Sequence, residues 1–264
     1  MSMIFKFIAR SLKMVCGDHF PQLVDSINHF SVFDCHNIKF YAPSKLCLWR
    51  GQTLLTKEPG TIEWINGFGK NDIFWDIGAN VGIYSLYAAL KKDIGVYSFE
   101  PSPFNFHVLA KNVYLNRLSS KIHAFCLAFS DQTTIDFLNM KSISDGAAHT
   151  SFKGKTNEFG DSFLPQHSQA TLGFRIDDFI KLFSLETPNH IKIDVDGAEA
   201  LVIEGSEKTL HSSKLKSILI ELTSDLKDKD RETFDKILSC GFILKRQDHP
   251  DGDLRLNNYI FYRE

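Results

Sequence analysis

Several common sequence features are absent from this chain of 264 residues, and each absence excludes a class of protein. The five cysteines are scattered and form no Cys-x-x-Cys pair, so neither a zinc site nor a disulfide framework is indicated. Thirty basic residues stand against 32 acidic ones, which gives no electrostatic case for a nucleic-acid partner. No apolar run approaches the ~18–20 residues of a membrane-spanning helix. Together these features favour a cytoplasmic protein in a reducing compartment.

The first 70 residues are expected to form an extension that begins with an amphipathic helix. Within residues 2–16, apolar side chains recur at helical spacing, opposite the basic residues Lys6, Arg10 and Lys13. Such a helix commonly packs on its own domain or on a second subunit of a homo-oligomer. Alternatively, it lies on the anionic inner face of a membrane as a peripheral contact.

The rest of the extension carries mixed signals and no low-complexity linker, so it is expected to dock on the core. Residues 37–41 and 46–49 resemble short strands in their apolar pattern. A turn at 57–60 precedes a short helix expected over 61–68.

Residues 71–264 alternate between strand and helix patterns, as one domain. This alternation predicts an α/β fold, doubly wound around a mostly parallel sheet, with an antiparallel edge after a turn at 250–252. Residues 128–138 are expected to form a hairpin. Residues 139–170 show little periodicity, which is typical of a functional lid or a disordered loop.

The first core strand runs into a turn with the pattern Asp-x-Gly-x-Asn-x-Gly, from Asp76 to Gly82. A strand that enters a helix through glycines brings bare backbone and a helix N-terminus close to a ligand. The dinucleotide fingerprint Gly-x-Gly-x-x-Gly fails here, since Asn80 and Ile83 stand where glycines belong. A dinucleotide oxidoreductase is therefore disfavoured.

Glu100 ends the second strand, 24 residues after Asp76. A carboxylate there can accept hydrogen bonds from ribose hydroxyls, and Asp76 adds a negative charge suited to an ammonium group. S-adenosylmethionine has both groups and no phosphate. In the alternative interpretation, Asp76 caps the next helix and Glu100 is a solvated strand end.

Ligands of such sheets bind at the carboxyl ends of the strands, near the point where strand order reverses. Glu58, in the extension, is a further candidate for contact with the cofactor. The candidate cofactor-binding residues are Glu58, Asp76, Gly78, Ala79, Asn80, Gly82, Glu100, Pro101, Ala128, Ser130, Asp131 and Asp194.

Several ordered blocks resemble the FkbM-like methyltransferases. They are Phe74 to Ser85, Ser98 to Asn105, Ala128 to Asp131, Ile176 to Phe179, and Ile191 to Glu199, and together with weaker similarity they span roughly residues 50–262. The last block departs from the family pattern, because Asp196 stands where Glu is usual. The resemblance implies a class I methyltransferase fold with seven strands, the last antiparallel, and S-adenosylmethionine as donor. It implies a hydroxyl acceptor on a sugar, a polyketide or another secondary metabolite.

Asp194, at the end of the fourth strand, is the first candidate for the catalytic base or for positioning the acceptor. It could instead only orient the turn that follows. His149, in the long loop, is the second catalytic candidate, against the commoner role of a surface histidine. Glu221 is expected to wall the acceptor pocket, and His190 to be structural.

No metal ligand set is assigned. Asp194, Asp196 and Glu221 offer oxygens, but no Asp-Asn pair after the fourth strand completes a site, so metal independence is favoured. Two further hypotheses stay open. One is an N-methyltransferase, and the other is a binding protein that keeps the fold without turnover.

Overall fold

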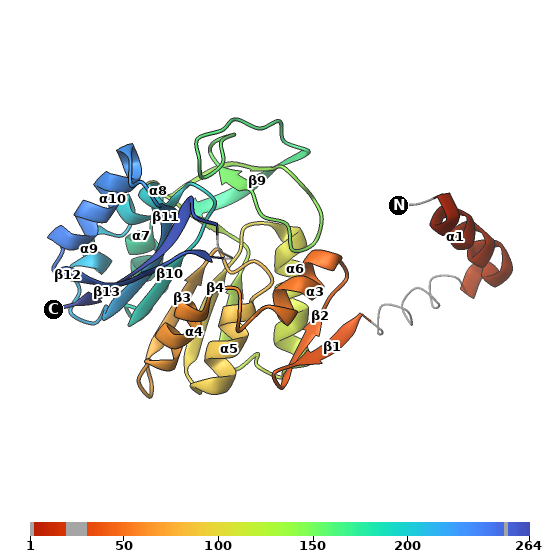
Figure 1. Ribbon diagram of the computed structural model, residues 1–264, viewed down its shortest axis with the longest axis horizontal. Coiled ribbons are helices and arrows are strands. Elements are labelled where there is room, and N and C mark those ends of the chain that lie inside the picture. The colour runs from red at the N-terminus through yellow and green to blue at the C-terminus, as the bar shows by residue number, and fades with distance from the viewer. Residues whose placement is uncertain (1–2, 20–30, 251–252) are drawn as a thin grey trace.

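One seven-stranded sheet with helices on both faces forms the centre of the molecule (Figure 1). The computed structural model describes residues 3–19, 31–250 and 253–264. Its strands are, in spatial order, β12 (Phe242–Asp248), β13 (Leu256–Arg263), β11 (Ser217–Thr223), β10 (His190–Ile193), β3 (Ile73–Ile77), β4 (Gly95–Phe99) and β5 (Ile122–Phe125). Its helices are α4 (Pro59–Asn66), α5 (Ile83–Lys91), α6 (Pro103–Leu115), α7 (Ile176–Phe183), α8 (Glu199–Glu204), α9 (Glu207–Leu210) and α10 (Asp228–Ser239).

The strand directions confirm the expected sheet. β5, β4, β3, β10 and β11 pair in parallel, while β13 runs antiparallel to both β11 and β12. This is a doubly wound, mostly parallel sheet of seven strands with an antiparallel edge, as the family resemblance of the sequence implies. The turn expected at 250–252 lies partly outside the described residues.

The two faces of the sheet have separate apolar cores because consecutive side chains of a strand point to opposite faces. In β3, Phe74 packs with α4, α5 and α6, whereas Trp75 packs with α7, α8 and α10. Around Trp75 the core is aromatic: its ring centroid lies 4.9 Å from that of Phe99, which lies 4.7 Å from Phe129. Much of the aromatic content of the sequence is therefore structural.

A second sheet has the order β6-β9-β7-β8, and Figure 1 draws β9 above the main sheet. Its strands are β6 (Ala128–Phe129), β7 (Thr134–Met140), β8 (Thr150–Phe152) and β9 (His167–Phe174). The hairpin expected over 128–138 is wrong, because β9 lies between β6 and β7 and pairs with both. Residues 139–170 also contain secondary structure, since β8 and the start of β9 fall within them. β6 and β9 are separated by some forty residues, so no turn signal in the sequence near β6 predicts their pairing.

The extension contains β1 (Val32–Cys35), β2 (Ile38–Tyr41) and α3 (Lys45–Gln52) before α4. The strand expected at 37–41 and the helix expected at 61–68 are confirmed as β2 and α4. The strand expected at 46–49 is wrong, because these residues lie within α3. Ser44 begins that helix: its hydroxyl accepts a hydrogen bond from the backbone N–H of Cys47 at 3.1 Å.

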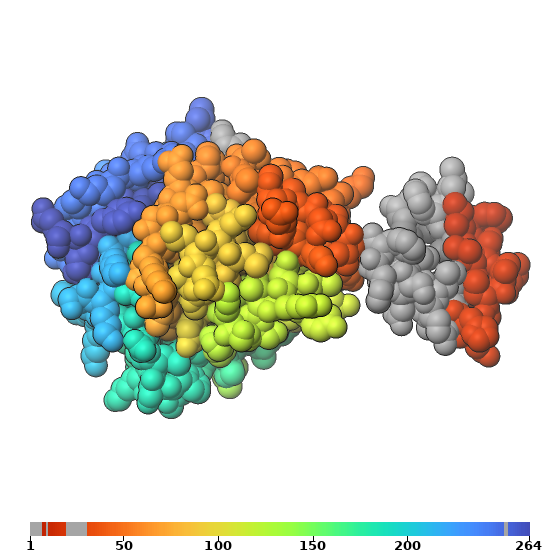
Figure 2. Space-filling model, turned by 90° about the horizontal axis from the view of Figure 1, so that it is seen from below, coloured from red at the N-terminus to blue at the C-terminus, as the bar shows by residue number. Residues whose placement is uncertain are grey.

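The part of the extension from residue 31 onward docks on the core. Asn112 in α6 accepts the backbone N–H of Tyr41 at 2.7 Å, and Asn116 accepts that of Lys39 at 2.9 Å. Figure 2 shows this orange-red segment against the yellow-green α6. Apolar side chains of β2 and α4 also share one core with α5 and α6.

The amphipathic helix forms as α1 (Met3–Cys16), followed by the short 3₁₀ helix η1 (Gly17–His19). Position 2 of the expected helix lies outside the described residues. Figures 1 and 2 both draw α1 apart from the sheet, and Phe7, Met14 and Val15 are more than 70% exposed at 72%, 83% and 81%. The surface on which this helix docks stays a prediction. Among the described residues, no helix has the length and apolarity needed to cross a membrane.

Candidate active site

The carboxyl ends of β3, β4, β10 and β11 open into a cavity of about 340 Å³. The second sheet and α3 supply further walls. Ligands of doubly wound sheets bind in this position. The polar and charged residues that line the cavity include Arg50, Lys57, Asn80, Glu100, Asn105, His149, Glu158, Asp194, Asp196, Glu221 and Arg255.

The expected cofactor residues divide into two groups by position. Those that line the cavity are Gly78, Asn80, Glu100, Pro101, Ala128 and Asp194. Those that are not part of this lining are Glu58, Asp76, Ala79, Gly82, Ser130 and Asp131. Their part in cofactor binding stays a prediction.

Two features of the backbone require glycine at position 78. Its φ of +82° disfavours any side chain, and a Cβ would lie 1.7 Å from the backbone oxygen of Asp194. The N–H groups of Gly78 and Ala79 both donate to the oxygen of Phe99, at 2.9 and 3.0 Å. The glycine therefore lets the ends of β3, β4 and β10 approach one another beside the cavity, which Gly78 also lines.

Glu100 is buried where β4 ends, and its two oxygens are held in place. Oε2 accepts the backbone N–H of Asn80 at 2.8 Å, and Oε1 accepts that of Ser102 at 2.9 Å. Burial raises the pKa of Glu100 to about 7 in spite of these bonds. Each carboxylate oxygen has a further lone pair, so the group can still accept hydrogen bonds from a diol in the cavity.

Asp76 is buried in β3. One oxygen accepts the hydroxyl of Ser85 at 2.5 Å, while Oδ1 is buried without a partner among the described residues. Burial raises the pKa of Asp76, although Lys192 opposes this. The role of Asp76 toward an ammonium group of the cofactor stays a prediction.

Lys192 is a buried residue of β10 whose amino group contacts Asp194 in the cavity lining. Its Nζ donates to Oδ2 of Asp194 at 2.6 Å, and the side chain of Asp194 is 24% exposed. Burial opposes the charge of Lys192, but Asp194, Glu58 and Asp76 outweigh it and raise its pKa. The position of Asp194 is thus set by a buried cation that sequence reasoning missed.

Glu58 is part of the same buried charge network. It accepts hydrogen bonds from Lys57, Thr61 and Asn258 at 3.0, 3.0 and 3.1 Å. Although burial favours the neutral acid, Lys57 and Lys192 lower the pKa of Glu58 to about 2. Glu58 therefore links the extension to β13 through Asn258, and its charge acts on the buried Lys192. Glu221 lines the cavity as expected, and burial followed by Asp194 raises its pKa.

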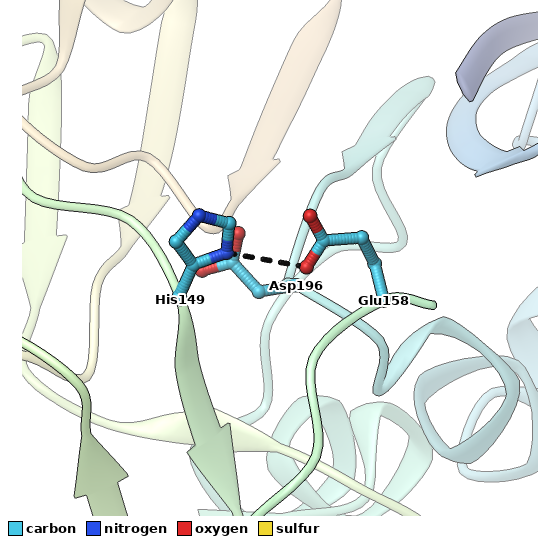
Figure 3. A group of neighbouring side chains, drawn as sticks. All are labelled: His149, Glu158 and Asp196. Atoms are coloured by element: carbon cyan, nitrogen blue, oxygen red, sulfur yellow. Dashed lines mark hydrogen bonds and ion pairs between the residues drawn. The ribbon is translucent and has the colours of Figure 1, made fainter. Parts of the chain in front are cut away.

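His149 lines the cavity next to two carboxylates, as Figure 3 shows. Its Nδ1 lies 3.3 Å from Oε2 of Glu158, and Asp196 accepts the backbone N–H of Thr150 at 3.1 Å. The bond to Glu158 raises the pKa of His149. Burial and then Asp194 raise the pKa of Asp196 to about 6. Asp196 is acidic like the glutamate usual at this position, and its carboxylate contacts the second sheet at Thr150.

Three other sequence candidates make hydrogen bonds within the protein. The hydroxyl of Ser130 donates to Asp131, whose carboxylate also accepts Lys153 at 2.9 Å, away from the cavity. His190 lies at the amino end of β10, within hydrogen-bonding distance of Asp72 and Ser217 at 2.9 and 2.7 Å, as expected for a structural histidine.

The fold and this cavity agree with the comparison against protein families. The model of the Methyltransferase FkbM domain matches residues 76–247, which is more than half of the chain. The chain belongs to this family. That membership confirms the resemblance of the sequence blocks and supports S-adenosylmethionine as the cofactor.

Three curated relatives agree with the family. Hexuronic acid methyltransferase AglP of Haloferax volcanii is 24% identical over 162 residues, covering 61% of this chain and 60% of that protein. The 31-O-demethyl-FK506 methyltransferase FkbM of Streptomyces tacrolimicus is 28% identical over 157 residues, covering 52% and 60%. Methyltransferase 1 of Beauveria bassiana is 26% identical over 211 residues, covering 74% and 83%. This FkbM-family chain thus spans about three fifths of the first two relatives.

The cavity of this FkbM-family chain fits S-adenosylmethionine by its donor and acceptor groups. Glu100 offers buried acceptors for a ribose, and the carboxylates that line the cavity suit a ligand with a sulfonium charge. Sequence reasoning missed Arg50, Lys192 and Glu158. The one available signal was Lys192, a charged residue in an otherwise apolar strand. Arg50 and Glu158 reach the cavity from a helix and a loop that no motif marks.

Proposed function

We propose that this protein transfers a methyl group from S-adenosylmethionine to a hydroxyl oxygen of a sugar, a glycan or a secondary metabolite. The observation that carries the proposal is the placement of Glu100 and Asp194 on the walls of one cavity. Glu100 is buried and fixed, as a ribose-binding carboxylate needs to be. Asp194 is partly exposed, as a group that meets the acceptor needs to be.

On the donor side, Glu100 accepts hydrogen bonds from the two ribose hydroxyls while Asn80 and Ser102 hold the carboxylate in position. Gly78 and Pro101 form the adjacent wall. When bound, S-adenosylmethionine supplies a methyl group on a positively charged sulfur.

On the acceptor side, Asp194 would accept the hydrogen bond of the substrate hydroxyl and take its proton as the oxygen–methyl bond forms and the methyl–sulfur bond breaks, which leaves a neutral thioether. Lys192 holds Oδ2 of Asp194 at 2.6 Å, so the carboxylate enters the reaction already oriented. Fixed orientation of the reacting groups is a large part of catalysis in a displacement of this kind.

The names of two relatives support an oxygen acceptor, since one names a hexuronic acid and the other a 31-O-demethyl compound. Arg50 and Arg255 line the same cavity and suit an acceptor that carries a carboxylate. A hydroxyl of a sugar acid is therefore the first acceptor to test.

The test has two stages. Calorimetry with S-adenosylhomocysteine should give saturable binding, with none for NAD. Incubation with S-adenosylmethionine and a panel of uronic acid glycosides, neutral glycosides and amines should then add one methyl group to a hydroxyl compound, seen by mass spectrometry. Binding of NAD in place of S-adenosylhomocysteine would contradict the proposal, and methylation of the amines alone would replace oxygen with nitrogen as the acceptor.

A further inference from the structure

Three side chains from separate segments lie close together (Figure 3), and all three line the cavity. His149 precedes β8, Glu158 lies in the loop between β8 and β9, and Asp196 follows β10. One potential ligand atom from each lies within 4.8 Å of the other two. The set joins the second sheet to the main sheet at the point where both border the cavity.

The chemistry of this set suits a divalent transition-metal ion. Zinc binds imidazole nitrogen and carboxylate oxygen at about 2.0–2.2 Å, and catalytic sites use three protein ligands with one open position. At these lengths, two ligand atoms of a tetrahedral site are about 3.4 Å apart. Nδ1 of His149 and Oε2 of Glu158 are already 3.3 Å apart, so a side-chain movement of Asp196 completes the triangle.

The charges around these three residues also favour a bound cation. Glu158 and Asp196 lie near a third carboxylate, Asp194, whose own partner is Lys192. His149 is itself a neutral ligand when it binds a metal. Arg255 lies over the ring of Phe159, at 4.2 Å, and pairs with Asp253. The carboxylates thus form an electronegative wall that a bound cation would neutralise.

We propose that His149, Glu158 and Asp196 bind one divalent transition-metal ion of the zinc or manganese class. All three residues are part of the cavity lining, so an ion that they hold would border the cavity. There the ion would hold the hydroxyl oxygen of the acceptor and favour loss of its proton to Asp194. This role in the reaction rests on the proposed function, whereas binding of the ion does not. The ligand set differs from the oxygens considered from sequence, and it replaces the expectation of metal independence.

The full-length protein, freed of metal by a chelator, tests the site directly. Titration with Mn²⁺, followed by the electron paramagnetic resonance signal of the free ion, should show one site with a Kd below about 1 mM. Zn²⁺ should compete for it. His149→Ala and Asp196→Asn should each weaken Mn²⁺ binding at least tenfold, since loss of outer partners of metal ligands alone costs about 10–100-fold. Glu158→Gln should act in the same direction.

His211→Ala is the matched control, because His211 is an exposed histidine at the end of α9, outside the cavity. It should leave Mn²⁺ affinity unchanged. Binding of S-adenosylhomocysteine, measured on every variant, reports that the fold is intact. A protein that binds S-adenosylhomocysteine but shows no saturable Mn²⁺ or Zn²⁺ site would overturn the proposal, as would a site unaffected by His149→Ala and Asp196→Asn. Metal binding without S-adenosylhomocysteine binding would support the site and count against the proposed function.

Discussion

The proposed donor side and the proposed acceptor side of the cavity are built in different ways. The donor side comes mainly from adjacent stretches of chain, the turn after β3 and the end of β4, where Asn80 and Glu100 join through a 2.8 Å hydrogen bond. The acceptor side gathers Lys192 and Asp194 of the main sheet, His149 of the second sheet and Glu58 of the extension. A short motif can specify the first kind of site, whereas only the complete fold assembles the second.

The largest expected effect would come from removing the buried cation that organises the acceptor side. Lys192→Met leaves Asp194, Glu58 and Asp76 without their shared partner, so the free energy of unfolding should fall by about 3–5 kcal/mol. Urea denaturation measures this. Lys121→Met, which removes an exposed ion pair with Asp93, should cost less than about 1 kcal/mol. Equal losses would show that Lys192 does not organise the site.

Asp194→Asn separates chemistry from binding on the acceptor side. The amide cannot take a proton, so kcat should fall about 10²–10³-fold, which corresponds to about 3–4 kcal/mol of barrier. The Kd for S-adenosylhomocysteine should change by less than about tenfold, because Glu100 and its partners are untouched. Near-normal kcat would refute the proposed role of Asp194.

Gly78→Ala tests the donor-side turn as a meeting point of strands. The new Cβ would collide with the Asp194 backbone oxygen at a positive φ, so the free energy of unfolding should drop by about 3 kcal/mol. Gly95→Ala is the control, since a Cβ at Gly95 meets nothing within 4 Å. If both variants unfold alike in urea, the close approach of the two strand ends is not needed for stability.

Glu100→Gln should have the smallest effect, about a tenfold loss of affinity for S-adenosylhomocysteine, because the charge is lost and one of two acceptor oxygens becomes an amide donor. The wild-type pKa of about 7 adds a pH test. Glu100 ionises as pH rises, so affinity should increase about tenfold between roughly pH 6 and pH 8. Calorimetry should give a flat profile for the glutamine variant. A wild-type profile equally flat would remove Glu100 from ribose recognition.

Sequence patterns located most of the main sheet correctly, because alternation of apolar strands and helices is a local property of the chain. They failed where partners are distant. Residues 46–49 have a strand-like pattern, yet the Ser44 cap starts a helix there. β6 has no local partner, and its pairing with β9 is set by a strand some forty residues later.

For the site, the sequence by itself determined the family motifs, the turn at Asp76 to Gly82, and Glu100 at the end of its strand. These residues are close in the chain, and parallel strands bring their ends to one edge. Only the tertiary structure decided which of them line the cavity: Asn80 and Glu100 are part of the lining, while Asp76 and Gly82 are not. It also decided that Lys192 holds Asp194 and that Glu158 meets His149. The physical reason is that charges interact through space, so their partners are fixed by packing and not by spacing along the chain.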